Sequence, residues 1–500
     1  MPITFYPPTC PAAAGVNHAP AAAGNAAASA EATKMLRDAL SGAAPVDRIL
    51  LKAAAGAGKS YELMKLIGDA VKHPRCTRVA VIAFTNKQVH PLATALGAAL
   101  GQDRVGLLVS RERLVDVPAE AHARATVVNS VTDLPGTCTV LIATCHRLGA
   151  IGELRRQQAH FGTGCNGTRP FDVLFVDEAW QLAHYLFDKV AKAAPITVGV
   201  GDVGQLPPLE IGANPWRGDP GYNPYRAWPT AYDGDARTWA TELPAVWRPA
   251  AGQLALWRAF YPEWATLNCV AAPGDRVLEA GHLSRVAAKV WKQVGTGVPT
   301  ILEVAGLPDP EAADIDLPLM QMAESLVDEL LTAGLVLRQA VYDGTGAPTG
   351  GQLAATPRAD HPDPLIAILA TRNQAVDDAA DVVARLRDKH GLNDNDVVSS
   401  TVDAYQGQTN GITVALHPLS GSAQLDEFNS AFGRLAVTCT RATHGLLVLS
   451  RPGLDQLLGE APARPGTPFG EPGNRQLPRQ THQRILSTFA RGTLRVPTTP

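Results

Sequence analysis

Short apolar runs that end in polar residues recur along this chain, and they predict buried parallel strands. In the first half the runs lie within DRILLKA, RVAVIAF, CTVLIAT, FDVLFVD and ITVGVGD. In the second half PLIAILA, DVVSST, GITVAL and HGLLVLS repeat the pattern, and segments with helical spacing lie between the runs. This alternation predicts an α/β protein with two domains. Each is expected to be a doubly wound parallel sheet with its chemistry at the carboxyl ends of the strands.

Several stretches depart from this alternation and suggest the domain limits. Residues 1–32 are rich in Ala and Pro and are expected to form a disordered or loosely helical lead-in. We expect a first domain over 33–247, with a short insertion at about 100–135 and a Trp/Tyr-rich segment at about 209–247. A second domain is expected over 248–452, and the Pro/Arg-rich residues 453–500 are expected to form a peripheral tail.

Composition narrows the class of protein further. The formal net charge is −3, so any nucleic-acid surface has to be local. Seven cysteines without a CxxC pair argue against a disulfide framework or a zinc module. No apolar run reaches membrane-spanning length, and the first residues lack the pattern of a signal peptide. We therefore expect a cytoplasmic protein with no membrane partner.

The segment DRILLKAAAGAGKSY places a strand, a small-residue loop and the start of a helix in succession. Such a loop leaves backbone N–H groups free to surround phosphate oxygens. Lys59 would reach the β and γ phosphates, and the Ser60 hydroxyl would bind Mg²⁺. The usual motif begins with Gly where this chain has Ala53, so a chance Ala/Gly-rich turn is the alternative. The loop residues expected to surround the phosphates are Gly56, Ala57 and Gly58.

Two downstream strands end in the polar partners that a phosphate loop needs. Asp177 and Glu178 follow the run FDVLFV, where the first carboxylate can hold Mg²⁺ and the second can accept a proton from an attacking water. Gln205 follows the run ITVGVGD and has the reach to hydrogen-bond the γ-phosphate or that water. The alternative for Gln205 is a turn with a satisfied amide.

Seven segments then resemble the motifs of superfamily 1 helicases. AAAGAGKS resembles motif I, AFTNKQV motif Ia, VDEAWQ motif II and GDVGQLPP motif III. AVWRPA resembles motif IV, STVDAYQGQT motif V and RLAVTCTRA motif VI. The segments occur in the family's order over residues 53–442, which chance matches would not respect. The forms of motifs II, III and V look closest to the Upf/RecD-like group, whereas FTNK looks UvrD-like.

The resemblance implies two RecA-like P-loop NTPase domains with small accessory insertions, closing around ATP and single-stranded nucleic acid. Movement from 5′ to 3′ is typical of the Upf/RecD-like group. By the same resemblance Arg248 and Arg441 would act as arginine fingers, because a cation supplied across a cleft stabilises transition-state charge when the domains close. The alternative for each arginine is an ordinary ion pair. Gly407 and Gln408 would lie near the nucleotide.

Contacts to nucleic acid are expected to be phosphate-directed, with aromatic rings stacking on bases. Trp216, in PWRG, resembles a stacking Trp of UvrD-like enzymes, and core packing is an equal alternative. His146 taken alone is more often a satisfied polar residue. The residues expected to grip the strand are Thr85, Asn86, Lys87, Thr144 and His146, with Thr401 and Gln406 linking it to the nucleotide.

Two departures from the family pattern limit these expectations. Residues 33–50 contain no Gln that could read adenine, so ATP is implied by the resemblance alone. The short insertion puts processive strand separation in doubt. An ATP-driven helicase or translocase on single-stranded DNA or RNA, with DNA favoured, is the first hypothesis. A nucleotide-gated switch in a repair or antiviral-defence complex, with a partner such as a nuclease, is the second. A P-loop kinase or metabolic NTPase is the third, and it leaves motifs V and VI unexplained.

Overall fold

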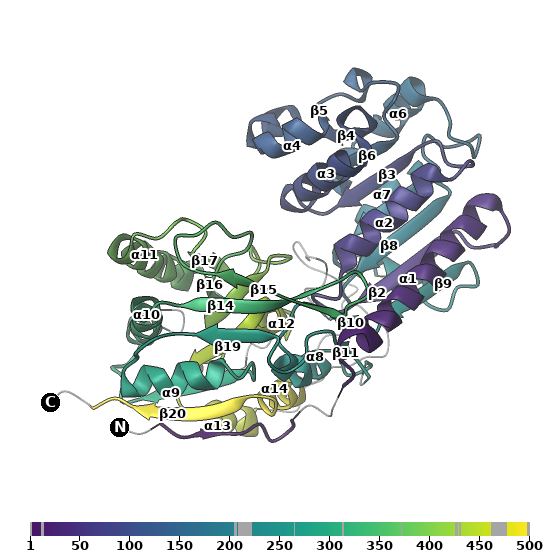
Figure 1. Ribbon diagram of the computed structural model, residues 1–500. Helices are drawn as coiled ribbons and strands as arrows, with labels where there is room; N and C mark the ends of the chain where they lie inside the picture. Colours follow the sequence, from purple (N-terminus) through teal and green to yellow (C-terminus); the bar gives the residue numbers. More distant parts are fainter. Residues whose placement is uncertain are drawn as a thin grey trace.

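Two large sheets, one in each lobe of the molecule, organise the chain (Figure 1). The structure is a computed structural model. It describes residues 3–11, 15–204, 208, 223–264, 266–312, 315–371, 373–425, 429, 432–461 and 478–497. Both ends of the chain lie beside the second sheet, at the lower left of Figure 1.

The first sheet has eight strands in the order β5-β4-β6-β3-β7-β8-β2-β9, and all of its pairings are parallel. Strand β8 separates the phosphate-loop strand β2 from β7, which carries the acidic pair. The carboxyl ends of these three strands therefore meet at one edge. The strands are β2 (Arg48–Ala53), β3 (Val79–Ala83), β4 (Val105–Leu108), β5 (Thr126–Val128), β6 (Val140–Thr144), β7 (Val173–Asp177), β8 (Ile196–Gly201) and β9 (Thr238–Leu243).

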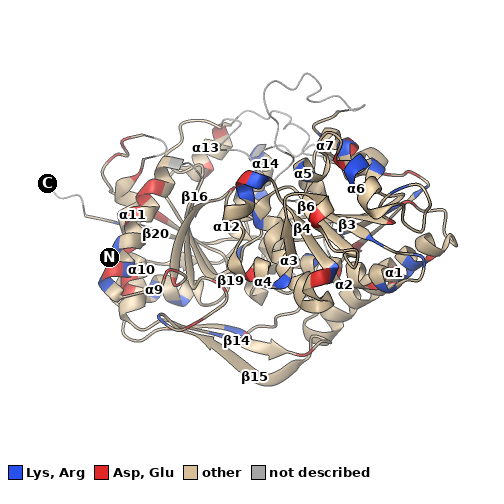
Figure 2. Ribbon diagram, turned by 90° about the horizontal axis from the view of Figure 1, so that it is seen from above, with Lys and Arg blue, Asp and Glu red and all other residues tan. Residues whose placement is uncertain are grey.

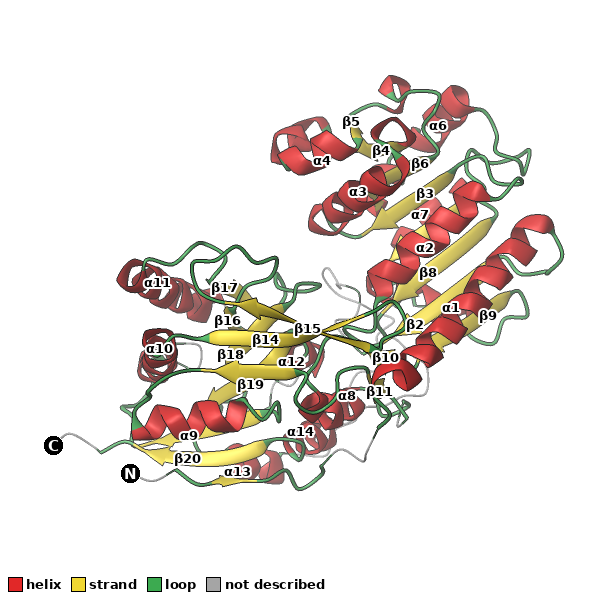
Figure 3. Ribbon diagram, in the orientation of Figure 1, coloured by secondary structure: helices red, strands yellow, loops and turns green. Residues whose placement is uncertain are grey.

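Helices cover both faces of this sheet (Figure 3). Successive residues of a strand point to opposite faces, so Ile49 and Leu51 pack with α1 and α2, whereas Leu50 packs with α5 and α7. No helix among the described residues is long and apolar enough to cross a bilayer. The helices of this lobe are α1 (His18–Ser41), α2 (Lys59–Lys72), α3 (Asn86–Leu100), α4 (Ala119–Arg124), α5 (Cys145–Leu148), α6 (Glu153–Phe161) and α7 (His184–Val190).

The second sheet has seven strands in the order β1-β20-β13-β19-β18-β16-β17, and only the edge strand β1 is antiparallel among the pairings described. The strands are β1 (Phe5–Tyr6), β13 (Thr300–Ala305), β16 (Ile366–Ala370), β17 (Val397–Thr401), β18 (Asn410–Leu416), β19 (Ala442–Ser450) and β20 (Ala490–Arg495).

One face of the second sheet packs against α9 (Arg285–Val294), α10 (Leu317–Thr332) and α11 (Asn373–His390). The other packs against α12 (Phe432–Cys439), α13 (Leu454–Glu460) and α14 (Pro478–Leu486). Helix α8 (Leu254–Phe260) joins that core to the core of the first lobe. Two lobes, each built on a sheet of mostly parallel strands with helices on both faces, confirm the predicted α/β fold class.

Of the two alternatives predicted for the Ala-rich lead-in, disorder and helix, the helix is present from His18 onward. Helix α1 begins at His18, and buried alanines such as Ala28 and Ala32 pack on the first lobe, while β1 pairs with β20. Alanine is the best helix former, and its small side chain lets helices approach closely. The alternative of disorder was wrong for these residues, because it relied on the absence of large apolar side chains at helical spacing.

The expected peripheral tail is also partly wrong. Strand β20 lies inside the second sheet, between β1 and β13, and pairs in parallel with β13 over Thr300–Ala305. Its sequence ARGTLR alternates buried and more exposed residues, as a strand with one covered face requires. Residues 462–477 and 498–500 lie outside the described part of the chain.

The accessory elements differ from expectation in kind. In the predicted insertion at about 100–135, β4 and β5 extend the first sheet. An unpredicted antiparallel sheet of β12 (Arg276–Glu279), β14 (Val336–Tyr342) and β15 (Pro348–Ala355) reaches toward the first lobe (Figure 1). A two-stranded sheet of β10 (Ala245–Val246) and β11 (Asn268–Cys269) lies between the lobes.

Candidate nucleotide and nucleic-acid site

The loop between β2 and α2 has the shape that a phosphate cradle needs. Gly56 (φ 73°) and Gly58 (φ 97°) lie in the left-handed region, which glycine adopts at little cost. A Cβ on Gly56 would also overlap the side chain of Arg248. Ala57, between the glycines, is buried. Helix α2 starts at Lys59, so its first N–H groups are available to an anion at the loop.

The backbone of this loop is held by side chains that the sequence did not single out. Asn25 of α1 donates hydrogen bonds to the carbonyls of Ala57 (3.1 Å) and Ala245 (2.9 Å). The indole of Trp257 donates to the carbonyl of Ala55 at 2.9 Å. These bonds fix the loop before a ligand binds, as a preorganised site requires.

The cation of Lys59 lies between two carboxylates from neighbouring strands. Its Nζ is 3.5 Å from Oε1 of Glu178 and 3.5 Å from Oδ2 of Asp202. Glu178 has φ 47°, a strained conformation for a residue with a side chain, and its buried Oε2 has no hydrogen-bond partner. Strain and an unpartnered buried oxygen are typical of functional sites. The predicted Lys59 and Glu178 are thus brought together.

A divalent cation fits the charge at this edge. Burial, followed by the charge of Glu178, raises the pKa of Asp177 to about 7, and Lys59 opposes the shift. No group of three or more His, Cys, Asp or Glu side chains arranged for a metal is found in the described part of the chain. Mg²⁺ is commonly held by one or two carboxylates together with substrate phosphates, so Asp177 and the hydroxyl of Ser60 suffice as protein donors.

Tyr261, after α8, connects the phosphate loop to the turn that follows β8. Its hydroxyl lies 2.9 Å from both carboxylate oxygens of Asp202, to which it donates, and it accepts the N–H of Ala55 at 3.0 Å. The ring fills the space where Gly204 would carry a Cβ. Burial, with Asp202 next, raises the pKa of Tyr261 well above its usual value, which keeps the hydroxyl protonated. The sequence alone assigned Tyr261 no role.

Arg248 reaches from the phosphate loop to the second lobe. Its backbone N–H donates to the carbonyl of Gly56 at 3.3 Å. Its guanidinium donates to the Thr409 hydroxyl and to the Thr440 carbonyl, both at 3.1 Å. Burial, with the charge of Arg441 next, lowers the pKa of Arg248 to about 9. The guanidinium groups of Arg248, which is partly buried, and Arg441 therefore lie close enough for their charges to repel each other.

Arg441 is 1 % exposed and precedes β19. It donates to the carbonyls of Val437 (3.1 Å) and Gln408 (3.4 Å), next to Gly407, whose φ is 81°. Burial lowers its pKa, and the first-lobe carboxylates Asp202 and Glu178 are among the groups that oppose this shift. The negative charges of the first-lobe site therefore act on the guanidinium of Arg441.

The predicted strand-gripping residues of the first lobe come together at the ends of two paired strands. Ala83 of β3 is in register with Thr144 of β6, so the segments that follow are neighbours. The ring of His146 lies 5.8 Å from that of Phe84, and His146 is exposed. Burial, with Lys189 next, lowers the pKa of His146, which favours its neutral form.

Some of these residues also have local structural roles. Thr85 forms a capping box with Gln88 at the start of α3, and Lys87 is exposed on its first turn beside Asn86. Thr144 caps α5 by accepting the N–H of Arg147 at 3.2 Å. Thr401 ends β17 and accepts the N–H of Ala404 at 3.1 Å. Gln406 lies in the turn before Gly407.

Two predicted site residues, Gln205 and Trp216, lie outside the described residues. Figure 2 shows basic and acidic positions intermixed on both lobes, which agrees with the near-balanced charge of the chain.

Comparisons with protein families and with curated proteins give one match, to part of the first lobe. Residues 37–210 match a family model described as an AAA domain. None of the curated proteins compared with the chain matches it. The phosphate loop and its acidic partners lie within the matched range.

Solved helicase structures are similar to the chain at low identity. The arterivirus nonstructural protein 10 helicase in complex with DNA has a TM-score of 0.39 and 15% identity, with 82% of this chain and 62% of that chain covered. The same protein solved without DNA gives 0.40 and 14%, with 82% and 61% covered. The DUF1998 helicase MrfA bound to DNA gives 0.40 and 9%, with 91% and 52% covered. The chain thus spans less than two thirds of the length of each.

Proposed function

We propose that this enzyme is an ATP-driven helicase or translocase of superfamily 1 that moves on single-stranded nucleic acid, DNA in preference to RNA. The observation that carries the proposal is the position of Arg248. Its backbone is bonded to the phosphate loop of one lobe, and its guanidinium is bonded to Thr409 and Thr440 of the other. A site completed from two lobes couples hydrolysis to their relative movement.

Each residue of the first lobe has a defined part in the proposed hydrolysis. Lys59 binds the β and γ phosphates, and Glu178 takes a proton from the water whose oxygen attacks the γ-phosphorus while the bond to the bridging β-oxygen breaks. Gln205 orients that water. Ser60 and Asp177 hold Mg²⁺, which when bound neutralises charge on the phosphate oxygens.

The arginines act from the other side of the same site. Arg248 and Arg441 would exchange their present carbonyl and hydroxyl partners for oxygens of the γ-phosphate as charge develops there. A guanidinium that is weakly hydrated and already buried loses little solvation in this exchange. The carbonyl of Gln408 accepts a hydrogen bond from Arg441. Movement of Arg441 would therefore be transmitted through Gln408 and Gly407 to the rest of the loop between β17 and β18.

The strand is proposed to run over the carboxyl ends of β3, β6 and β17. Lys87 with Thr85 and Asn86 would hold one phosphate, and Thr144 with His146 the next. Thr401 and Gln406 would hold the strand on the second lobe, and Trp216 would stack on a base. Movement from 5′ to 3′ and a cytoplasmic setting belong to the proposal through the family resemblance.

The test is an ATPase assay of the full chain with and without single-stranded DNA or RNA, followed by single-turnover unwinding of duplexes with 5′ or 3′ tails. We expect strand-stimulated hydrolysis that Lys59→Ala lowers by about 10²-fold or more. Hydrolysis indifferent to any strand would refute the motor. Strand-stimulated hydrolysis without unwinding or translocation would instead identify a switch.

A further inference from the structure

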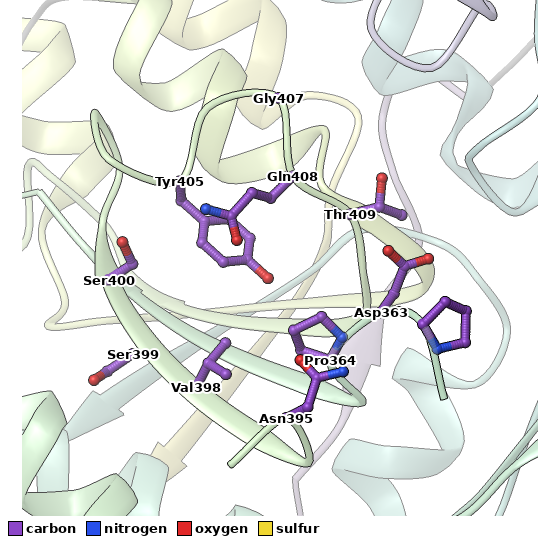
Figure 4. Close-up of a pocket in the computed structure, with 11 residues that line it drawn as sticks. Asp363, Pro364, Asn395, Val398, Ser399, Ser400, Tyr405, Gly407, Gln408 and Thr409 are labelled. Atoms are coloured by element: carbon purple, nitrogen blue, oxygen red, sulfur yellow. The ribbon is translucent and has the colours of Figure 1, made fainter. Parts of the chain in front are cut away.

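A pocket of about 440 Å³ lies in the second lobe beside the two arginines. Its lining includes Gly407 and Gln408, which the family resemblance places near the nucleotide, but the resemblance assigns no part of the ligand to the rest of the pocket. Its walls come from the loop before β16, from β17 and from the loop between β17 and β18 (Figure 4). This volume suits a small organic ligand. Its polar side chains are those of Asp363, Asn395, Ser399, Ser400, Gln408 and Thr409.

The pocket contains a buried polar atom that needs a partner. Tyr405 is 2 % exposed, and its hydroxyl has no hydrogen-bond partner. Figure 4 shows this hydroxyl directed across the pocket toward Asp363 and Pro364. A buried hydroxyl without a partner costs free energy that a ligand can recover.

The carboxylate of Asp363 is carried by a rigid loop. The neighbouring His361 contacts the Asp363 carbonyl through Nδ1 at 2.7 Å and the Asp396 carboxylate through Nε2 at 2.8 Å. Asp396 also accepts the N–H groups of Arg358 (2.9 Å) and Asn393 (2.7 Å). The loop is therefore preorganised to present one acceptor group to a ligand.

The lining chemistry selects among ligands. No Lys or Arg occurs among the described residues that line the pocket, so it suits hydroxyl or amino groups better than phosphate. The face of the Tyr405 ring is buried and is not available to stack on a base. A carboxylate beside hydroxyl and amide groups is instead the set that binds the hydroxyls of a ribose.

The pocket is connected to the phosphate loop through one side chain. Arg248 donates to Thr409 on the pocket rim, and its own backbone is bonded to Gly56. Burial raises the pKa of Asp363, and the charge of Arg248 opposes the shift. The pocket therefore borders the same side chain that packs on the phosphate loop.

We propose that the pocket binds the ribose of the nucleoside triphosphate, with Asp363 accepting hydrogen bonds from the sugar hydroxyls and the Tyr405 hydroxyl bonding the same sugar. This inference rests on the proposed nucleotide hydrolysis and deepens it, because it makes the enzyme selective for ribonucleotides over 2′-deoxyribonucleotides. Selectivity then originates in the second lobe, away from the phosphate loop.

The test compares kcat/KM of the full chain for ATP and 2′-dATP in the presence of single-stranded DNA. We expect wild-type protein to prefer ATP by about 10-fold, the value of one hydrogen bond to a charged group. Asp363→Ala should reduce this ratio to about 1, chiefly by raising KM for ATP, and Tyr405→Phe should reduce it in part. Asp360→Ala removes an exposed carboxylate from the same loop and should leave the ratio unchanged.

Other outcomes overturn the proposal. An ATP to 2′-dATP ratio that neither Asp363→Ala nor Tyr405→Phe changes would refute it while leaving hydrolysis intact. If Asp363→Ala instead alters stimulation by RNA relative to DNA, the ribose belongs to the strand and the nucleotide assignment is wrong. If the chain hydrolyses no triphosphate, the proposed function fails. Equal calorimetric affinity for ADP and 2′-deoxy-ADP, or no binding of either, would then refute the pocket assignment as well.

Discussion

The two lobes present opposite edges of similar sheets to the same site. The first lobe uses the carboxyl ends of β2, β7 and β8, where the phosphate loop, Glu178 and Asp202 lie. The second uses the amino ends of β18 and β19, which Thr409 and Arg441 precede. Helix N-termini gather at a carboxyl edge and attract anions, whereas helix C-termini gather at an amino edge.

This difference explains why two guanidinium groups lie at the edge of the second lobe. The guanidinium of Arg441 donates to carbonyls at the end of α12 and before β18, where a cation is favoured. The first lobe binds through backbone N–H groups and one lysine. The second lobe holds the guanidinium groups of Arg248 and Arg441 on carbonyl and hydroxyl groups that bind them only moderately, so both can turn to a phosphate.

The largest effect is expected when the proton acceptor of the first lobe is removed. Glu178→Gln keeps the shape of the side chain and its place beside Lys59, so nucleotide should still bind. We expect the strand-stimulated kcat to fall by about 10²- to 10⁴-fold. Glu120→Gln, at an exposed position on α4, is the control. Near-normal turnover by Glu178→Gln would show that Glu178 is not the proton acceptor.

A comparable loss is expected from the opposite edge. Arg441→Lys keeps a buried cation but loses the planar fork, so binding of ATP should change little while kcat falls by about 10³-fold. Steady-state kinetics with a parallel thermal melt separate this loss from unfolding. Arg385→Lys, at an exposed ion pair with Glu324, is the matched control. Equal loss of kcat and of ATP affinity would contradict a role confined to the transition state.

A smaller effect is expected from Tyr261, which connects the phosphate loop to the turn after β8. Tyr261→Phe keeps the ring against Gly204 but removes the hydroxyl shared by Ala55 and Asp202. Lys59 would be less precisely held, and we expect kcat to fall by about 10-fold with KM little changed. Tyr61→Phe on α2 is exposed and serves as the control. An unchanged kcat would show that Tyr261 only packs.

The sequence predicts a feature of the site more easily when the residues that form it are close together in the chain. The phosphate loop and the acidic pair are encoded in single short segments, so strand-then-loop spacing was sufficient. The bond between Tyr261 and Asp202 joins residues 59 apart, and the contact of Asn25 with Ala57 depends on a helix whose Ala-rich sequence looked disordered.

The second lobe was harder to predict because its pairings are more distant. Strand β20 lies beside β13 through the return of the chain end, and β14 with β15 has no regular apolar run. Arg441 and Arg248 were found through motif resemblance. Their closeness to each other could be seen only in the structure. The pocket at Asp363 combines three segments, and the segment that carries Asp363 has no motif of its own.

The smallest effect concerns the stability of the second lobe. Burial, with His482 next, lowers the pKa of His417 to about 3, and its Nδ1 accepts the N–H of Leu419 at 3.1 Å. The unfolded chain binds a proton at this residue near pH 6.5 and the folded chain does not. The contribution of the neutral His417 to the free energy of unfolding is therefore fully present above pH 6.5 and is lost as the pH falls toward 3.

We expect His417→Gln to reduce that loss by roughly 1.4 kcal/mol per pH unit between pH 6.5 and 5. Urea denaturation of both proteins at pH 7 and pH 5 measures it. The same pH dependence in wild type and variant would mean that His417 is not the responsible group. His390→Gln, at a less buried pair with Asp328 on the surface of the lobe, is the comparison.

The most direct measurement is a structure of the full chain with ADP, aluminium fluoride, Mg²⁺ and single-stranded DNA. A site shared between the lobes requires both Arg248 and Arg441 to have left Thr440 and Gln408 and to contact the fluoride, opposite Lys59 and Glu178. A trapped nucleotide contacted by the first lobe alone, with both guanidinium groups still on their second-lobe partners, would contradict it.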